Sequence, residues 1–136
     1  MKELCSTCQV VFSVIGGTLG YFLGGLDGML YTLLVFVVID YLTGVLCVIA
    51  DKRLSSEVGF NGIARKIIIF ALVGIAHLLD VQILGHVGVL RAMVIFFYVS
   101  NEGISIVENA SHLGLLIPEK LKSILQQLKE RGNEHE

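Results

Sequence analysis

The sequence predicts an all-α integral membrane protein, with four transmembrane helices in two hairpins and a cytoplasmic amphipathic helix at the C-terminus. Hydrophobic residues make up 54% of the 136 positions and charged residues only 16%, whereas an ordinary soluble domain carries about 25% charged residues. The mean hydropathy is +0.79, and so small a chain has no soluble core that buries this much apolar surface. The apolar residues also gather in four runs of about the length that spans a bilayer.

The first two apolar runs, residues 9–26 and 28–50, are separated only by Asp27, which predicts a tight helical hairpin. Five glycines in the first run lower its helix propensity. A three-helix arrangement, in which residues 9–26 enter and leave the bilayer on the same side, therefore stays open.

Three of these glycines, Gly16, Gly20 and Gly24, recur every four residues and so share one helix face. Small residues at this spacing let two helix backbones approach closely inside a membrane. We expect this face to pack against another helix, either in a second copy of the chain or within the same chain.

The last two apolar runs, residues 67–84 and 87–107, are separated only by positions 85 and 86 and predict a second hairpin. A polar linker, residues 51–66, connects the two hairpins. Residues 1–113 thus form the predicted transmembrane domain, and residues 114–136 form the predicted tail.

The tail predicts a short amphipathic helix that begins at Pro118, because proline costs little at the first position of a helix. Apolar side chains recur at helical spacing along one face of this segment. We expect that face to lie on the membrane or to pair with a second copy. These residues are Ile117, Leu121, Ile124, Leu125 and Leu128.

The basic residues predict the orientation, because Lys and Arg are retained on the cytoplasmic side of a membrane. All but Arg91 lie at the two ends of the chain or in the linker. Both termini are therefore predicted to be cytoplasmic. The residues on that side are Lys2, Lys52, Arg53, Arg65, Lys66, Lys120, Lys122, Lys129 and Arg131.

The fourth apolar run carries the strongest functional signal, a polar stripe along one helix face. A charge at the bilayer centre costs about 3 kcal/mol, so the stripe must face protein or water. We interpret it as the lining of an aqueous pathway through several assembled copies; packing against neighbouring helices is the alternative. The stripe consists of Arg91, Tyr98, Asn101, Glu102, Ser105, Glu108, Asn109 and His112.

Polar residues also interrupt the second and third runs. Asp40 shares a helix face with Thr43 and Gly44, and its carboxyl either locks two helices together or lines and gates the pathway. Gly44 is a further candidate for close helix packing.

On the third run, His77 and Asp80 lie one turn apart. Asp80 lies near the C-terminal end of the third run, close to where the fourth run begins. We expect Asp80 to form an ion pair with Arg91, with a structural rather than a functional role.

Nothing in the sequence predicts an enzyme, a metal site or a cofactor. Cys5-x-x-Cys8 resembles half of a zinc or redox site, but no second Cys/His pair stands at a suitable spacing. The net charge of −2 supplies no basic excess for binding nucleic acid. The expected partners are the lipid bilayer and further copies of the chain.

Four stretches of the sequence resemble the toxin-secretion/phage-lysis holin family. They are residues 40–46 (DYLTGVL), 54–66 (LSSEVGFNGIARK), 76–80 (AHLLD) and 90–109 (LRAMVIFFYVSNEGISIVEN). The most specific part is the NEGISIVEN segment with Pro118-Glu-Lys-Leu121 after it. Family members commonly show a second proline near position 116, where this chain has Leu116.

The resemblance implies a small protein of the bacterial cytoplasmic membrane that oligomerises into holes during host lysis. Such holes release an endolysin, a cell-wall hydrolase, or in some relatives a secreted toxin, without a required direct contact. Two other kinds of function stay open. One is a small ion channel or proton-coupled transporter with Asp40 and Glu102 as titrating groups, and the other is a membrane anchor whose tail recruits a partner.

Overall fold

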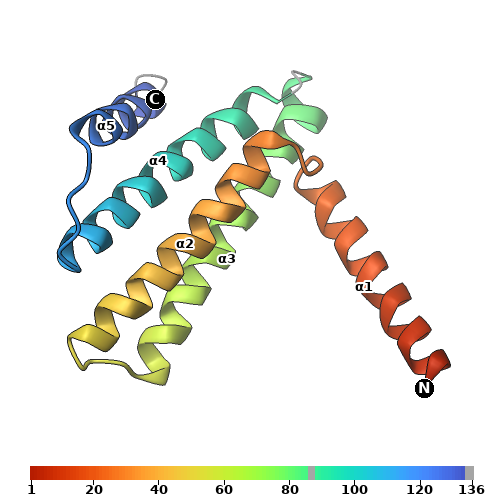
Figure 1. Ribbon diagram of the computed structural model, residues 1–136. Helices are drawn as coiled ribbons and strands as arrows, with labels where there is room; N and C mark the ends of the chain where they lie inside the picture. The colour runs from red at the N-terminus through yellow and green to blue at the C-terminus, as the bar shows by residue number, and fades with distance from the viewer. Residues whose placement is uncertain (86–87, 134–136) are drawn as a thin grey trace.

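The computed structural model describes residues 1–85 and 88–133, and that part of the chain is helical with short connections (Figure 1). The helical architecture confirms the predicted all-α class. Four helices are long and apolar enough to cross a membrane. The turn predicted at position 86 lies outside the described residues. The helices are α1 (Lys2–Phe22), α2 (Gly28–Ala50), α3 (Ser56–Leu78) with its π-helical continuation η1 (Leu79–Leu84), α4 (Val89–His112) and α5 (Glu119–Asn133).

Helices α2, α3 and α4 form a bundle, while α1 projects away from it (Figure 1). The expected hairpin between the first two segments is therefore wrong in its packing, since α1 has no buried residue and does not run along α2. Its one close contact is with α3, where the Phe22 ring covers Gly74. A Cβ atom at Gly74 would lie 2.0 Å from that ring, so only glycine admits it.

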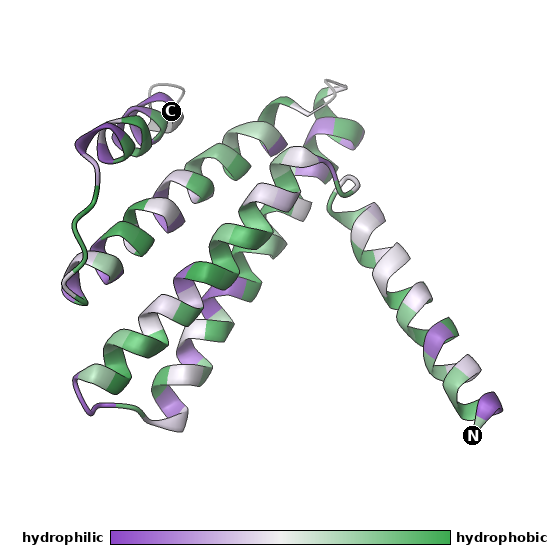
Figure 2. Cartoon of the chain, in the orientation of Figure 1, coloured by the Kyte–Doolittle hydropathy of each residue, from purple (hydrophilic) through white to green (hydrophobic). Residues whose placement is uncertain are grey.

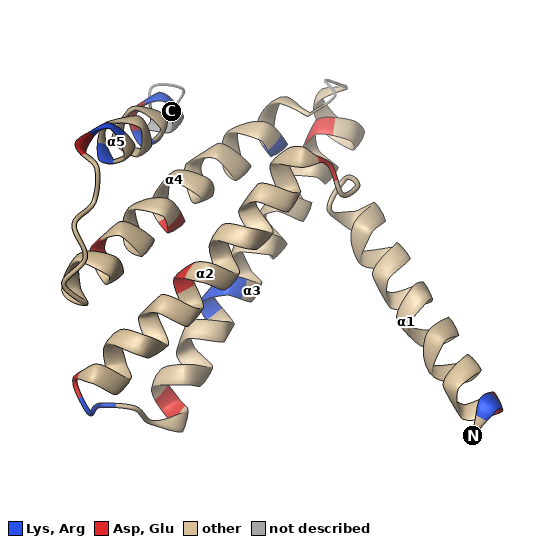
Figure 3. Ribbon diagram, viewed as in Figure 1, with Lys and Arg blue, Asp and Glu red and all other residues tan. Residues whose placement is uncertain are grey.

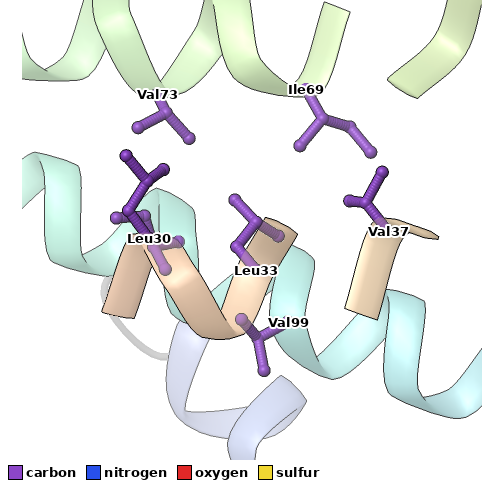
Figure 4. Close-up of a cluster of buried hydrophobic side chains, with 7 residues drawn as sticks. Leu30, Leu33, Val37, Ile69, Val73 and Val99 are labelled. Atoms are coloured by element: carbon purple, nitrogen blue, oxygen red, sulfur yellow. The ribbon is translucent and has the colours of Figure 1, made fainter. Parts of the chain in front are cut away.

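The apolar core lies where the three bundle helices meet (Figure 4). Leu33 of α2, Val73 of α3 and Ile95 of α4 are completely buried there. Between helices in lipid, such contacts contribute van der Waals packing rather than the hydrophobic effect. The other members of the core are Leu30, Val37, Ile69 and Val99.

Polar caps determine where the bundle helices begin. The Asp27 carboxylate accepts a hydrogen bond from the Leu30 N–H at 2.9 Å, and the Ser55 hydroxyl accepts one from the Val58 N–H at 3.2 Å. Each cap is worth about 1 kcal/mol. The cap at Ser55 starts α3 eleven residues before the predicted position 67, so most of the expected polar linker is helix. The hydropathy pattern identified only where the apolar run starts, whereas the helix itself begins earlier in the chain.

Large apolar side chains remain exposed along α1, α2, α3 and α4 (Figure 2). The exposed apolar surface covers the outward faces of helices that are long enough to span, as expected for helices in contact with lipid. Helix α5 is mostly hydrophilic by contrast (Figure 2). The chain is therefore built as a membrane protein with one polar accessory helix.

Within one chain, helix α5 packs against α4; lying on the membrane or pairing with a second copy stays a prediction. Gly114, with φ of 90°, ends α4 in a backbone conformation that suits glycine. The Pro118 carbonyl then accepts from the Leu121 N–H at 3.1 Å, which confirms that α5 starts beside this proline. Leu125 is buried against α4.

Candidate functional site

A cluster of three charged residues connects the bundle helices near their middle. We call Asp40 of α2, Lys66 of α3 and Glu102 of α4 the central cluster. The Lys66 ammonium donates hydrogen bonds to both Asp40 Oδ2 and Glu102 Oε2. An acidic position of α2 thus lies beside basic positions of α3 (Figure 3).

The three members lie at one depth because of where their helices begin and end. Each stands about ten residues, or about 15 Å, from the helix end nearest Asp51. We call that end of the bundle the Asp51 end, and the opposite end the Asp27 end. Sequence reasoning placed Lys66 in the linker and missed it as a site residue.

Two carboxylates share one ammonium in the central cluster. Asp40 and Glu102 are both buried, and the side chain of Lys66 is 18% exposed. Charges are costly in such a place unless they are paired and hydrogen-bonded. One negative charge stays uncompensated unless a carboxyl holds a proton or water reaches the site.

A cavity of about 250 Å³ adjoins the central cluster. Its lining extends from Asp40 and Lys66 to Leu54 and Val58 near the Asp51 end. A water molecule occupies about 30 Å³ in the liquid, so the cavity has room for several. It offers a route for water or protons between the cluster and that end.

Asn109 of α4 extends the polar contacts toward the Asp51 end. Its side-chain amide donates to Asp40 Oδ1 at 3.2 Å and to Thr43 Oγ1 at 3.0 Å. Gly44 leaves room beside it, since a Cβ there would lie 3.8 Å from Asn109 Nδ2. Cys47 donates its S–H to the Asn109 carbonyl at 3.4 Å. These bonds hold α2 to α4 over two helical turns.

At the Asp51 end itself, the ends of α2 and α4 meet through an exposed hydrogen-bonded contact. His112 Nε2 lies 3.1 Å from both carboxylate oxygens of Asp51, and Arg53 donates to Asp51 Oδ2 at 2.8 Å. The hydrogen bonds from Arg53 and then His112 hold the pKa of Asp51 below its usual value.

A second charged cluster, which we call the turn cluster, lies at the Asp27 end and consists of Asp27, Asp80 and Arg91. Arg91 donates to Asp27 Oδ2 at 2.7 Å and to the carbonyls of Leu23 and Gly25 at 2.6 and 2.9 Å. This guanidinium hydrogen bond holds the pKa of Asp27 below its usual value.

The expected ion pair between Asp80 and the Arg91 side chain is wrong. Asp80 instead accepts hydrogen bonds from the backbone N–H groups of Leu90 and Arg91, both at 2.9 Å. It thereby caps the start of α4, where four N–H groups lack helical partners. The guanidinium is free to reach Asp27 on the neighbouring turn.

Gly24 belongs to this turn and not to a helix face. Helix α1 ends at Phe22, and Gly24 has φ of 86°. A Cβ there would lie 2.7 Å from both Arg91 Nε and His77 Nδ1. Gly16 and Gly20 have nothing within 4 Å of a Cβ position, so their role in packing stays a prediction.

The residues of the predicted polar stripe of α4 fall into two groups in the structure, those bound to other elements and those that are not. Arg91, Glu102 and Asn109 bind partners on other elements of the same chain, as the alternative reading had it. Tyr98 packs beside the apolar core, while Asn101 and Ser105 are half-buried and Glu108 is exposed. Whether any of them lines an aqueous pathway between copies stays a prediction.

No group of three His, Cys, Asp or Glu residues that could hold a metal ion occurs within residues 1–85 and 88–133. Cys5 and Cys8 are exposed on α1. The arrangement of the described side chains thus concentrates its polar chemistry in the two charged clusters.

Comparison with known proteins finds one matching family. The model of the bacteriophage holin family matches residues 17–130. An uncharacterized protein of Clostridium perfringens strain 13 is 38% identical over 96% of this chain and 95% of its own length. An uncharacterized protein of Listeria innocua is 46% identical over 81% of this chain and 78% of its own. No solved structure matches the chain.

Proposed function

Because the chain belongs to the bacteriophage holin family, we propose that it assembles into holes that permeabilise the bacterial cytoplasmic membrane during host lysis. The family match over residues 17–130 carries this proposal. The four helices of spanning length and composition are consistent with it. The holes would release an endolysin, or in some settings a toxin, without direct contact between the two proteins.

The packing of a single chain supports assembly of several copies. Helix α1 has no buried residue, so one chain leaves a whole spanning helix without close neighbours over most of its length. Small residues at Gly16 and Gly20 allow close approach of another helix backbone. We propose that α1 finds its packing partner in a second copy.

The orientation belongs to the same proposal. Lys52 and Arg53 lie at the Asp51 end, and positive residues are retained in the cytoplasm. Lys66 lies within the bundle and is mostly covered, which removes it from this count but does not reverse the balance. We propose that the Asp51 end, both termini and the amphipathic tail belong to the cytoplasmic side before holes open.

The central cluster also supports a second candidate, a small ion channel or proton-coupled transporter. Intramembrane ionisable groups beside a cavity are typical of ion and proton pathways. In that case a compact oligomer would pass only its own solute. The two candidates therefore differ in the size of what crosses the membrane.

The test is inducible expression in bacteria, with membrane potential and culture density recorded together, with and without a co-expressed cytoplasmic cell-wall hydrolase. We expect an abrupt, timed loss of potential followed by lysis only in the culture with the hydrolase. A leak of small ions without release of the hydrolase would favour the channel. A culture that keeps its potential would overturn both.

A further inference from the structure

The tail helix α5 lies alongside the spanning part of the bundle, not beyond its end. Leu125 fills a notch at Gly103, where a Cβ atom would lie 2.6 Å from Leu125 Cδ2 and 3.1 Å from Phe36 Cε2. Gly103 stands about nine residues, or about 14 Å, inside the end of α4. The contact is therefore at membrane depth.

Further contacts continue toward the Asp27 end. Leu121 and Leu128 of α5 line one groove together with Thr32 of α2 and Phe96 of α4. Thr32 stands in the second turn of α2 after the Asp27 cap. Helix α5 is thus folded back along the bundle and covers the face shared by α2 and α4.

The outward face of α5 is polar. Its exposed polar residues recur at spacings of three and four and so occupy one side of the helix, opposite Leu125. Both hydrophilic and hydrophobic residues occur along α5 (Figure 2). The residues are Lys120, Ser123, Gln127, Glu130 and Arg131.

Such a face is incompatible with lipid at that depth. A charge near the bilayer centre costs about 3 kcal/mol, and this face carries three charged residues. Docked α5 therefore requires water on its outer side. Water at this depth is present only where the membrane has been opened.

We propose that α5 lines the open hole, with its apolar side docked on α2 and α4 and its polar side in the water that fills the hole. The inference rests on the proposed function, and it assigns the lining to a segment outside the four spanning helices. Two charged members of the α4 stripe fit this arrangement, because Arg91 and Glu102 are already paired within the chain.

Docking and opening are coupled in this arrangement. Before assembly, lipid surrounds the bundle and α5 is more stable in cytoplasmic water. After copies enclose water, the docked state becomes the more stable one. An environment that interacts more favourably with one of two states shifts the equilibrium toward that state, to an extent set by the difference in interaction free energy.

The test uses the purified full chain, with Cys5, Cys8 and Cys47 replaced by serine and with Gly103→Cys and Leu125→Cys introduced. The protein is reconstituted into phosphatidylglycerol and phosphatidylethanolamine vesicles that contain a fluorescent dextran. Oxidation joins positions 103 and 125 and locks α5 in its docked position. The reduced protein in the same vesicles is the control.

We expect the cross-link to form in vesicles that release dextran, and the cross-linked chain to release dextran as the reduced chain does. Loss of release on cross-linking would overturn the inference, because α5 would then have to leave α4. Absence of the cross-link in releasing vesicles would overturn it too. Failure of the reduced chain and its cysteine-free parent to release dextran would instead contradict the proposed function itself.

A second pair of variants tests the outward face directly. Lys120→Leu with Glu130→Leu and Arg131→Leu removes the three charges of that face, so docked α5 becomes stable in lipid and release should fall by at least about tenfold. Lys120→Arg with Glu130→Asp and Arg131→Lys keeps the face charged and should retain release. Equal release from the two variants would overturn the lining role.

Discussion

The central cluster and the turn cluster each set two carboxylates against one cation, but they are balanced differently. In the turn cluster, the second carboxylate, Asp80, binds backbone N–H groups at the start of α4, where the helix dipole is positive. The central cluster has no helix end within reach, because its members stand in the middle of their helices. There the two carboxyl groups share Lys66, and the Asn109 amide adds one hydrogen bond to Asp40.

The two clusters therefore suit different roles. The turn cluster stabilises the turns between helices, whereas the central cluster is suited to a change in its charge or hydrogen bonding. The backbone compensates every charge of the turn cluster, so that cluster stabilises the ends of three helices. The central cluster sets two buried carboxyl groups against one ammonium beside a cavity. Chains commonly retain such locally unfavourable arrangements at functional sites.

The largest expected effect comes from Lys66→Met. The substitution leaves Asp40 and Glu102 facing each other without a cation, and loss of one partner from a buried pair costs about 3–5 kcal/mol. We expect the variant to unfold at much lower denaturant concentration in detergent and to accumulate poorly in membranes. Arg65→Met, at the exposed neighbouring position, is the matched control.

Glu102→Gln added to Lys66→Met should restore part of the stability, because it removes one of the two charges. Equal stability of Lys66→Met and Arg65→Met would show that the central cluster is not charged as described.

Asp80→Ala should have a smaller effect on the free energy of unfolding. It removes two hydrogen bonds from the start of α4, and loss of such a cap costs about 1–2 kcal/mol. Denaturation in detergent, followed by circular dichroism, measures the change. Asp80→Asn keeps one side-chain oxygen as an acceptor and should fall between the wild type and Asp80→Ala; the reverse order would contradict the capping role.

Asp27→Asn should have the smallest effect, and its size should depend on pH. Because Arg91 lowers the pKa of Asp27 below 3.8, the pair stabilises fully above that pH, and its contribution is lost as pH falls through the lower folded pKa. The wild type should therefore exceed Asp27→Asn in stability at neutral pH, and the gap should shrink in strong acid. A gap that is constant across this range would rule out the ion pair as its source.

Much of the architecture follows from the sequence, because apolar runs of spanning length define helices in lipid. The predicted run at residues 28–50 coincides with α2. The third helix was placed too late, because Ser56, Glu57 and Lys66 are polar although the helix continues through them. Ser55 was the missed signal, since its hydroxyl caps the start of α3.

The pairing of charges was less predictable than the helices. Lys66 escaped notice as a site residue because it was assigned to the linker. Counting about ten residues in both directions from the Asp51 turn would have matched it with Asp40. The partner of Arg91 depends on how two turns meet in space, and spacing along the chain cannot distinguish Asp27 from Asp80.

The tail shows the same limit. Periodicity placed Leu125 on the apolar stripe of the tail, and Leu125 is buried, while Leu121 and Ile124 of the same stripe are exposed. The helix begins at Glu119, next to Pro118. Periodicity does not identify the surface that covers the stripe. The notch at Gly103 appears only once α2 and α4 are packed together.

The most direct test of the functional role of the central cluster is the lysis time of Glu102→Leu, expressed with a cytoplasmic hydrolase. The substitution removes one of the two carboxyl groups that share Lys66 and leaves the Asp40–Lys66 pair, so insertion and stability should be retained. We predict that membrane potential persists and the hydrolase stays inside, while Glu57→Leu, at an exposed carboxylate outside both clusters, lyses like the wild type. An unchanged lysis time for Glu102→Leu would contradict the account.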